Sequence, residues 1–230
     1  MDTALHLKAV LLDIEGTTTS LEFVTGTLFG FARERLHDFL RRRSPELKED
    51  LRLLLAEWGA DRAAGLLPPS WEGGSPEAYI RWLMGRDRKA TGLKALQGHL
   101  WREGYEQGLL RGHVYDDVKP ALKRWTAAGL TVAIFSSGSV QAQRLLFAHS
   151  VAGDLTAYLS AYFDTTTGPK REPESYRTIC DELGVAPGAL VFLSDTIEEL
   201  DAAQEAGCRT RLVIRGSPRH PAVRSLADVV

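Results

Sequence analysis

Residues 7–16 read LKAVLLDIEG: an apolar run over residues 7–12 ends at an acidic turn. Three further short apolar runs lie at residues 130–135, 190–193 and 210–214. All four runs are nearly continuous rather than alternating, which is typical of parallel strands that are buried on both faces of a sheet. They therefore predict the strands of one parallel sheet.

Helical patterns separate the last three runs. They cover the segment from Pro120 to Gly129, then residues 139–147, 176–183 and 198–206. A strand followed by a helix and then by the next strand is the repeating unit of doubly wound α/β proteins. The pattern predicts an α/β fold with a doubly wound parallel sheet.

Residues 21–112 do not follow this alternation. They are rich in Leu, Arg and Trp, and their apolar residues recur at helical spacing over residues 47–58, 76–84 and 91–107. Such a stretch is long enough to form a small domain of its own. We expect an all-helical cap at residues 21–112, inserted into an α/β catalytic core that comprises residues 1–20 and 113–230.

The composition excludes several classes of protein. Of the 230 residues, 44% are hydrophobic and 25% are charged, as in globular proteins and unlike disordered, collagen-like or coiled-coil chains. The formal net charge of −2 creates no field that would attract nucleic acid or an anionic membrane. Apolar runs stay far below the ~20 residues of a membrane span, and no secretory leader is visible. We expect a cytoplasmic monomer without nucleic-acid or membrane partners.

Acidic residues follow two of the predicted strands. Asp13 and Glu15 stand two positions apart beside Gly16, so that one carboxylate can attack an electrophile while the other moves protons. Asp195 follows residues 190–193, and carboxylates at such a position can hold Mg²⁺, which prefers oxygen ligands. The alternatives are an acidic turn after the first strand and, after the later one, acids that favour the positive N-terminus of the next helix.

Two further groups suit a phosphate. Ser136 and Ser137 lie between a strand and a helix, where hydroxyl and backbone N–H groups can bind an anion. The alternative is an ordinary helix cap, for which Ser139 is the best candidate. Lys170 follows a Gly-Pro turn and can pair with a phosphate and a carboxylate together, although a lone lysine is most often solvated.

Three of these four groups fall at the carboxyl ends of predicted parallel strands. Open α/β sheets bind their ligands along that edge, so the groups are expected to converge on one crevice. This joint occurrence favours a phosphate-handling site over four unrelated surface features.

The ordered set formed by these residues resembles the haloacid dehalogenase superfamily of phosphotransferases. More narrowly, four stretches are similar to the enolase-phosphatases of methionine salvage: DIEGTT at residues 13–18, LKALQGH at 93–99, SSGSVQAQ at 136–143 and FDTTTGPK at 163–170. The similarity spans nearly the whole chain, and it includes the predicted cap.

The resemblance implies a function and a set of roles. Enolase-phosphatases convert 2,3-diketo-5-methylthiopentyl-1-phosphate by enolisation and dephosphorylation to the acireductone 1,2-dihydroxy-3-keto-5-methylthiopentene, with Mg²⁺ as cofactor. By this resemblance Asp13 is the nucleophile and a metal ligand, Glu15 the acid/base group and a metal ligand through its backbone carbonyl, and Asp195 a further metal ligand. The resemblance also implies that Ser136, Ser137 and Lys170 bind the phosphoryl oxygens. Glu199 is expected to support the water shell of the metal.

Two other functions remain open at this point. One is a single-step phosphatase of the same superfamily that acts on another small phosphate ester. The other is a phospho-acceptor signalling domain, which uses similar residues but needs no large helical cap. Within the cap, five side chains are candidates for substrate contact, although each is more often core or surface: Phe23, Tyr79, Trp82, Lys89 and His99.

Overall fold

The computed structural model describes residues 6–43, 45–71, 75–86, 88, 90–215 and 226. The chain forms two compact units, one comprising Met1–Val24 with Arg111–Val230 and the other Thr25–Leu110. The expected boundaries lay at 20/21 and 112/113, so residues 21–24 and 111–112 belong to the first unit rather than to the insert. A physical reason is that Phe23 is buried and its ring lies 6.0 Å from the His113 ring.

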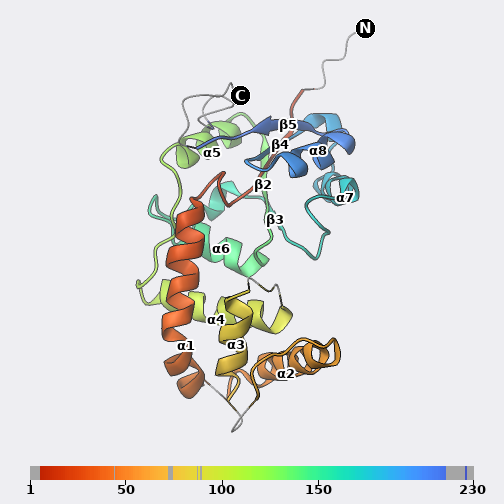
Figure 1. Ribbon diagram of the computed structural model, residues 1–230. Helices are drawn as coiled ribbons and strands as arrows, with labels where there is room; N and C mark the ends of the chain where they lie inside the picture. Colours follow the sequence, from red (N-terminus) through yellow and green to blue (C-terminus); the bar gives the residue numbers. More distant parts are fainter. Residues whose placement is uncertain are drawn as a thin grey trace. The chain divides into compact units, whose positions relative to one another are not determined.

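The described part of the first unit contains a five-stranded parallel sheet in the order β3-β2-β1-β4-β5 (Figure 1). Its strands are β1 Ala9–Leu12, β2 Thr131–Phe135, β3 Ala161–Phe163, β4 Leu190–Ser194 and β5 Arg209–Leu212. Leu12 pairs with Ile134 of β2 and with Leu193 of β4, so these three strands end at nearly the same level. The predicted parallel sheet is confirmed, while β3 was not predicted.

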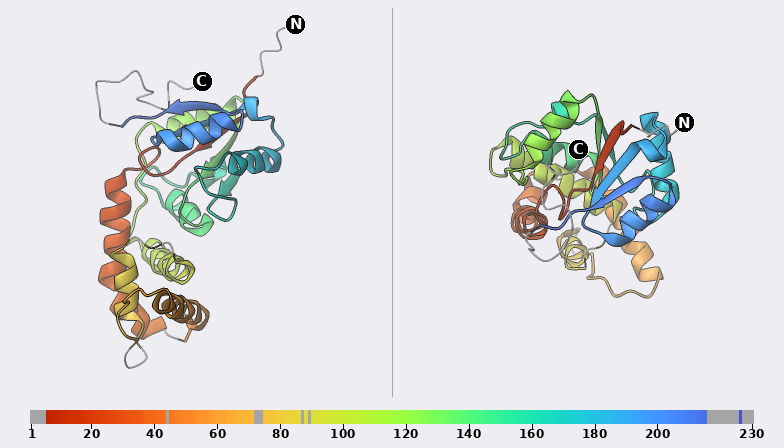
Figure 2. Two further views of the ribbon diagram at one scale, coloured as in Figure 1. Left: turned by 45° about the vertical axis from the view of Figure 1, so that its right-hand side comes forward. Right: turned by 90° about the horizontal axis from the view of Figure 1, so that it is seen from above.

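Helices cover both faces of this sheet. They are α5 Val118–Ala127, α6 Val140–Ala148, α7 Pro173–Leu183 and α8 Ile197–Glu205, with short 3₁₀ turns at Thr156–Tyr158 and Pro187–Ala189. Seen from above in Figure 2, α5 and α6 lie on one side of the strands and α7 and α8 on the other. On the α7–α8 side, Tyr176 and Ile179 pack with Leu11, Phe135 and Phe192. The doubly wound α/β fold is therefore confirmed.

Among the described residues of the second unit, every regular element is a helix. A π-helical segment, Phe23–Leu28, leads into α1 Phe29–Arg43, which is followed by α2 Lys48–Ala63, α3 Glu77–Met84 and α4 Thr91–Glu106. These four α-helices share one core, in which Leu36, Leu54, Ile80 and Leu96 are fully buried. Across the described residues of the chain, no helix has the length and apolarity needed to span a membrane.

Candidate active site

Asp13 is held at the carboxyl end of β1 by a tight turn. Its backbone N–H donates to the carbonyl of Leu193, and its Oδ1 accepts from the N–H of Ile14 at 2.7 Å. The N–H groups of residues 17–19 all donate to the carbonyl of Ile14, and these three threonines are fully buried. The acidic turn is therefore held by backbone hydrogen bonds and largely buried, rather than a solvated loop.

Gly16 brings this turn against the end of β4. Its φ of +72° lies in the left-handed region, and a Cβ added there would lie 1.9 Å from Oδ2 of Asp195. Any other residue would be strained by the backbone conformation and would also push the carboxylate away. The absence of a side chain at Gly16 thus allows this turn to lie directly against the carboxylate of Asp195.

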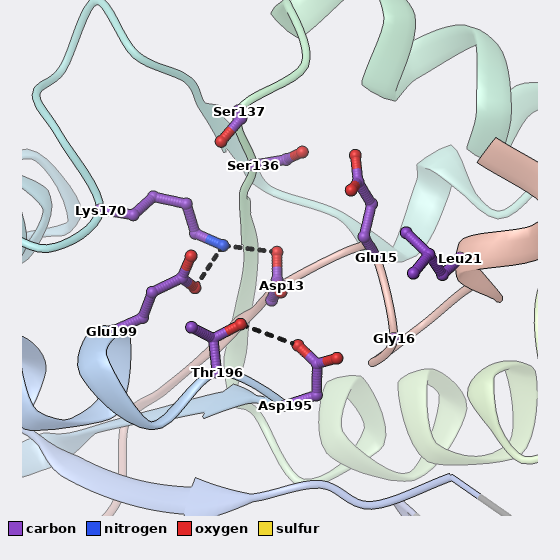
Figure 3. A pocket seen from close by; sticks show the side chains of 10 residues that line it. All are labelled: Asp13, Glu15, Gly16, Leu21, Ser136, Ser137, Lys170, Asp195, Thr196 and Glu199. Atoms are coloured by element: carbon purple, nitrogen blue, oxygen red, sulfur yellow. Dashed lines mark hydrogen bonds and ion pairs between the residues drawn. The ribbon is translucent and has the colours of Figure 1, made fainter. Parts of the chain in front are cut away.

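Lys170 forms a buried ion-pair cluster with two carboxylates (Figure 3). Its Nζ lies 2.6 Å from Oδ1 of Asp13 and 2.5 Å from Oε2 of Glu199. Ser194 adds a hydroxyl that donates to Glu199 at 3.0 Å and more distantly, at 3.4 Å, to Oδ2 of Asp13. Lys170 is only 8% exposed, so the alternative of a solvated surface lysine is wrong.

Burial is the largest single influence on the pKa values of Asp13 and Lys170. It raises the pKa of Asp13 to about 7; Lys170 opposes this shift and Glu199 adds to it. Burial alone would lower the pKa of Lys170, but its two carboxylate partners outweigh that effect and hold the pKa above its ordinary value. One ammonium group thus faces two carboxylates in a site of low polarity.

Ser136 and Ser137 follow β2 directly. The N–H of Ser136 donates to the carbonyl of Phe163, and its Oγ accepts from the N–H of Gly138 at 3.2 Å. The cap of α6 is Ser139, whose side chain accepts from the N–H of Ala142. Because Ser139 supplies the cap, the two preceding serines stay at the pocket.

Hydrogen bonds connect the stretch at residues 136–143 to the stretch at residues 163–170. The Nε2 of Gln143 donates to the carbonyls of Gly138 and Phe163, at 2.9 and 2.8 Å, and Oδ2 of Asp164 accepts from the N–H of Val140. These contacts fix the serine loop to the start of the loop that carries Lys170. This explains why polar residues without a place in the pocket occur in both motif stretches.

The backbone of Lys170 is fixed from α7. Tyr176 donates its hydroxyl to the carbonyl of Lys170 at 2.7 Å, and Ser175 donates to the carbonyl of Pro169 at 2.7 Å. A Cβ at Gly168, where φ is +149°, would lie 2.3 Å from Oγ of Ser175. The Gly-Pro turn is therefore what allows the lysine loop to approach α7 so closely.

One pocket collects all six residues that were predicted for the site. Its volume is about 250 Å³. Its lining comprises Asp13, Glu15, Gly16, Leu21, Ser136, Ser137, Lys170, Asp195, Thr196 and Glu199 (Figure 3). Sequence reasoning missed Thr196, which donates to Asp195 at 3.1 Å, and Leu21, an apolar side chain that is 57% exposed. The position of Thr196 directly after Asp195 was an available signal, whereas Leu21 carries none.

Comparison with known proteins places this site in a family. The sequence pattern of the haloacid dehalogenase-like hydrolases matches residues 7–207, which include the pocket residues and the helical insert. The chain belongs to the haloacid dehalogenase-like hydrolases. The resemblance inferred from the motif residues is thereby confirmed.

Within these hydrolases the chain is similar to proteins named enolase-phosphatase E1. The one from Synechococcus elongatus is 52% identical, over 94% of this chain and 92% of the relative. The one from Pseudomonas aeruginosa is 46% identical, over 97% and 98%. Among solved structures, the UTR4 protein of Saccharomyces cerevisiae is 33% identical and covers 94% of each chain with a TM-score of 0.74. The similarity thus extends over the core and the insert together.

The donor set of this haloacid dehalogenase-like site fits Mg²⁺. The described residues contain no group of three or more His, Cys, Asp and Glu side chains arranged to hold a metal. The candidate donors are two carboxylates, Asp13 and Asp195, with the backbone carbonyl of Glu15. Mg²⁺ is commonly bound by one or two carboxylates, with waters and phosphate oxygens completing the shell. In addition, four acids and one lysine line the pocket, so its excess charge is negative.

Glu199 and the described cap candidates have structural surroundings in this hydrolase that account for them. Glu199, expected at the water shell of the metal, contacts Lys170 and Ser194. Tyr79 is a core residue that donates to Asp61, and His99 pairs with Asp50. Trp82 lies under the guanidinium of Arg86, Phe23 is buried, and Lys89 is outside the described residues.

Proposed function

We propose that this protein is an enolase-phosphatase that converts 2,3-diketo-5-methylthiopentyl-1-phosphate to acireductone in methionine salvage. The observation that carries the proposal is the buried contact between Lys170 and Asp13 in a pocket shared with Glu15, Ser136 and Ser137. The enolase-phosphatases to which the chain is similar over nearly its full length support the same activity.

The phosphatase step uses Asp13 as the nucleophile. A carboxylate oxygen of Asp13 bonds to phosphorus while the ester P–O bond breaks, and the leaving oxygen takes a proton from Glu15. A water then attacks phosphorus, returns a proton to Glu15 and releases phosphate and the free aspartate. Because a carboxylate and a phosphate dianion repel each other, Lys170 offsets the charge, and the serine hydroxyls orient the phosphoryl oxygens.

The magnesium ion would be held by Asp13, Asp195 and the backbone carbonyl of Glu15. When bound, it supplies positive charge that stabilises the phosphoryl group during transfer. We expect chelation to stop turnover without unfolding the protein, because a chain of 230 residues buries enough core without a metal.

The enolisation step falls to Glu15. A carbon next to a ketone loses a proton and the ketone oxygen gains one, so a single carboxyl group that reaches both atoms can carry the proton between them. The glutamate has one methylene more than the aspartate found at this position in most of the superfamily, which extends its reach. Leu21 offers an apolar surface to the methylthioalkyl chain, and Leu21→Asn should raise KM for this substrate more than for an ester that lacks the chain.

The decisive experiment supplies the diketo phosphate to the purified protein and follows enol absorbance and released phosphate together. Formation of both products supports the proposal. Phosphate release from other small esters without enol formation from the diketo phosphate would identify a single-step phosphatase instead. A stable aspartyl phosphate without turnover would identify a phospho-acceptor domain.

The proposal also includes the protein's setting. We propose a cytoplasmic monomer whose partner is a small-molecule phosphate and which needs neither nucleic acid nor a membrane. Light scattering during size-exclusion chromatography measures the molar mass and so tests whether the protein is a monomer. A dimer would give twice the mass of one chain.

A further inference from the structure

Arg215, which follows β5, binds the turn that carries the proposed nucleophile. Its Nε donates to the carbonyl of Thr17 at 3.0 Å and its Nη2 to the same carbonyl at 2.5 Å, although the two residues are 198 positions apart. Its Nη1 donates to Oδ2 of Asp117 at 2.7 Å. The guanidinium also lies over the ring of Tyr115, with its carbon 4.2 Å from the ring centroid.

The carbonyl that Arg215 binds lies in the core of the unit. Thr17 is 0% exposed, so bulk water does not reach this residue. Within the same turn, the carbonyl of Ile14 accepts from residues 17–19, and the carbonyl of Thr18 accepts from the N–H of Tyr115. A buried carbonyl that loses its donor destabilises the fold, because its lost interaction with water is no longer compensated by a hydrogen bond. The hydrogen bonds from the guanidinium of Arg215 to the Thr17 carbonyl therefore help to stabilise this turn.

The turn leads directly to the pocket. Gly16 precedes Thr17, and its backbone lies against the carboxylate of Asp195, while Glu15 and Asp13 precede it. A shift of the Thr17 carbonyl would therefore move the backbone of Glu15 and Gly16 relative to Asp195. Since misplacement of reacting groups by about 1 Å can lower a rate 100-fold, the position of this turn matters for turnover.

We propose that Arg215 is a positioning residue that fixes the turn at residues 13–19, and so sets the geometry of Asp13 and Glu15 for the reaction. The inference rests on the proposed function for the roles of those two carboxyl groups. Asp117 orients the guanidinium, and it also accepts from the N–H of Leu226. A lysine could not reproduce the arrangement, because it lacks the planar fork that bonds two acceptors and stacks on a ring.

Three variants separate positioning from general stability. Arg215→Met keeps most of the length and removes the guanidinium, and Arg215→Lys keeps a charge. Arg211→Met is the control, since Arg211 is exposed on β5, the strand that Arg215 follows, and donates to its neighbour Thr210. We expect Arg215→Met to lower kcat about 10- to 100-fold, the usual effect of losing a residue that supports a site. KM should change far less, because Ser136, Ser137 and Lys170 lie outside the turn. Arg215→Lys should recover part of the loss.

Hydrogen exchange gives a second readout that needs no substrate. The amides of residues 17–19 should exchange faster in Arg215→Met than in the wild type or in Arg211→Met. An unchanged kcat, a loss of activity that only follows the loss of folded protein, or unchanged exchange at the turn would each overturn the inference. An inactive wild type would contradict the proposed function. The hydrogen-exchange measurement would still test whether Arg215 stabilises the turn, because it needs no substrate.

Discussion

The ammonium group of Lys170 lies 2.6 Å from a carboxylate oxygen of Asp13, although 157 positions of the chain separate the two residues. Both side chains are almost completely buried, at 7% and 6% exposure, and the lysine also lies 2.5 Å from Glu199. A cation in this position offsets part of the charge of its two carboxylate partners, and it lines the pocket that is proposed to hold the phosphate. Stability and reactivity therefore depend on the same side chain.

Lys170→Met should lower both the thermal midpoint and phosphate release. The change leaves two buried carboxylates without their cation, and removing one partner of a buried ion pair is destabilising by about 3–5 kcal/mol. Thermal unfolding and a phosphate assay measure the two effects. Lys123→Met, at an exposed position on α5, is the matched control. A Lys170→Met protein with wild-type stability would show that the cluster does not depend on the cation.

Asp13→Asn should abolish phosphate release while the fold persists. An amide is a poor nucleophile, but it keeps the shape of the side chain, and Lys170 retains Glu199 as a partner. Single-turnover phosphate release and circular dichroism test the two parts. Asp116→Asn, an exposed neighbour of α5, should leave both unchanged. Undiminished release by Asp13→Asn would rule out a covalent aspartyl intermediate.

Glu15→Gln and Glu15→Asp should separate the two chemical steps. Glu15→Gln removes the proton donor and should reduce turnover roughly 10²- to 10⁴-fold, the range for general acid–base catalysis. Glu15→Asp keeps the charge and shortens the reach, so enol formation should fall more than hydrolysis of a simple phosphate ester. Parallel assays on the diketo phosphate and on the simple ester measure both. Equal losses would mean that the extra methylene has no role in enolisation.

Gly16→Ala should destabilise the fold and weaken Mg²⁺ binding. A non-glycine residue in the left-handed region raises the free energy by about 1–3 kcal/mol, and the new methyl group would displace the carboxylate of Asp195. Thermal unfolding and the magnesium concentration for half-maximal activity give the two measurements. Gly30→Ala serves as control, because a Cβ there meets nothing within 4 Å. If the magnesium requirement were unchanged, Asp195 would have no part in holding the ion.

Glu103 should make part of the insert's stability dependent on pH. Hydrogen bonds from Arg42 lower its pKa against the opposing effect of burial, and Arg43 adds to the shift. A carboxyl group whose pKa is lower in the folded state stabilises the fold above its unfolded pKa and loses that effect as the pH falls through the folded value. The wild type should therefore exceed Glu103→Gln in thermal midpoint at pH 7, and the difference should shrink on acidification. A difference that does not vary with pH would show that the ion pairs contribute nothing.

The sheet, the helical insert and all six predicted pocket residues could be inferred from the sequence because they rest on local patterns. The apolar runs end directly before Asp13, Ser136 and Ser194. Because parallel strands have their carboxyl ends at the same edge of the sheet, the residues that follow these runs could be placed at that edge. The strand Ala161–Phe163 was missed, since three residues show no periodicity, and it is the strand whose loop carries Lys170.

Contacts between residues far apart in the sequence could not be predicted from local patterns. A single arginine after a strand reads as a surface residue, and nothing in the sequence marks the carbonyl of Thr17 as the partner of Arg215. Likewise, the pairing of Glu199 with Lys170 depends on how α8 and the lysine loop meet, which no spacing encodes. The burial of Phe23, which moved the boundary of the insert, is of the same kind.

The central place of β1 in the sheet has a consequence for the order of folding. This strand is made first, yet its two neighbours, β2 and β4, are made only after the whole insert and much of the remaining chain. Residues 25–110 can fold from their own local contacts during synthesis, whereas Ala9–Leu12 must wait as an unpaired apolar segment. We therefore expect the ribosome-bound chain to contain a folded helical unit and an incomplete sheet. Phosphatase activity should appear in one late step, when β4 and α8 dock.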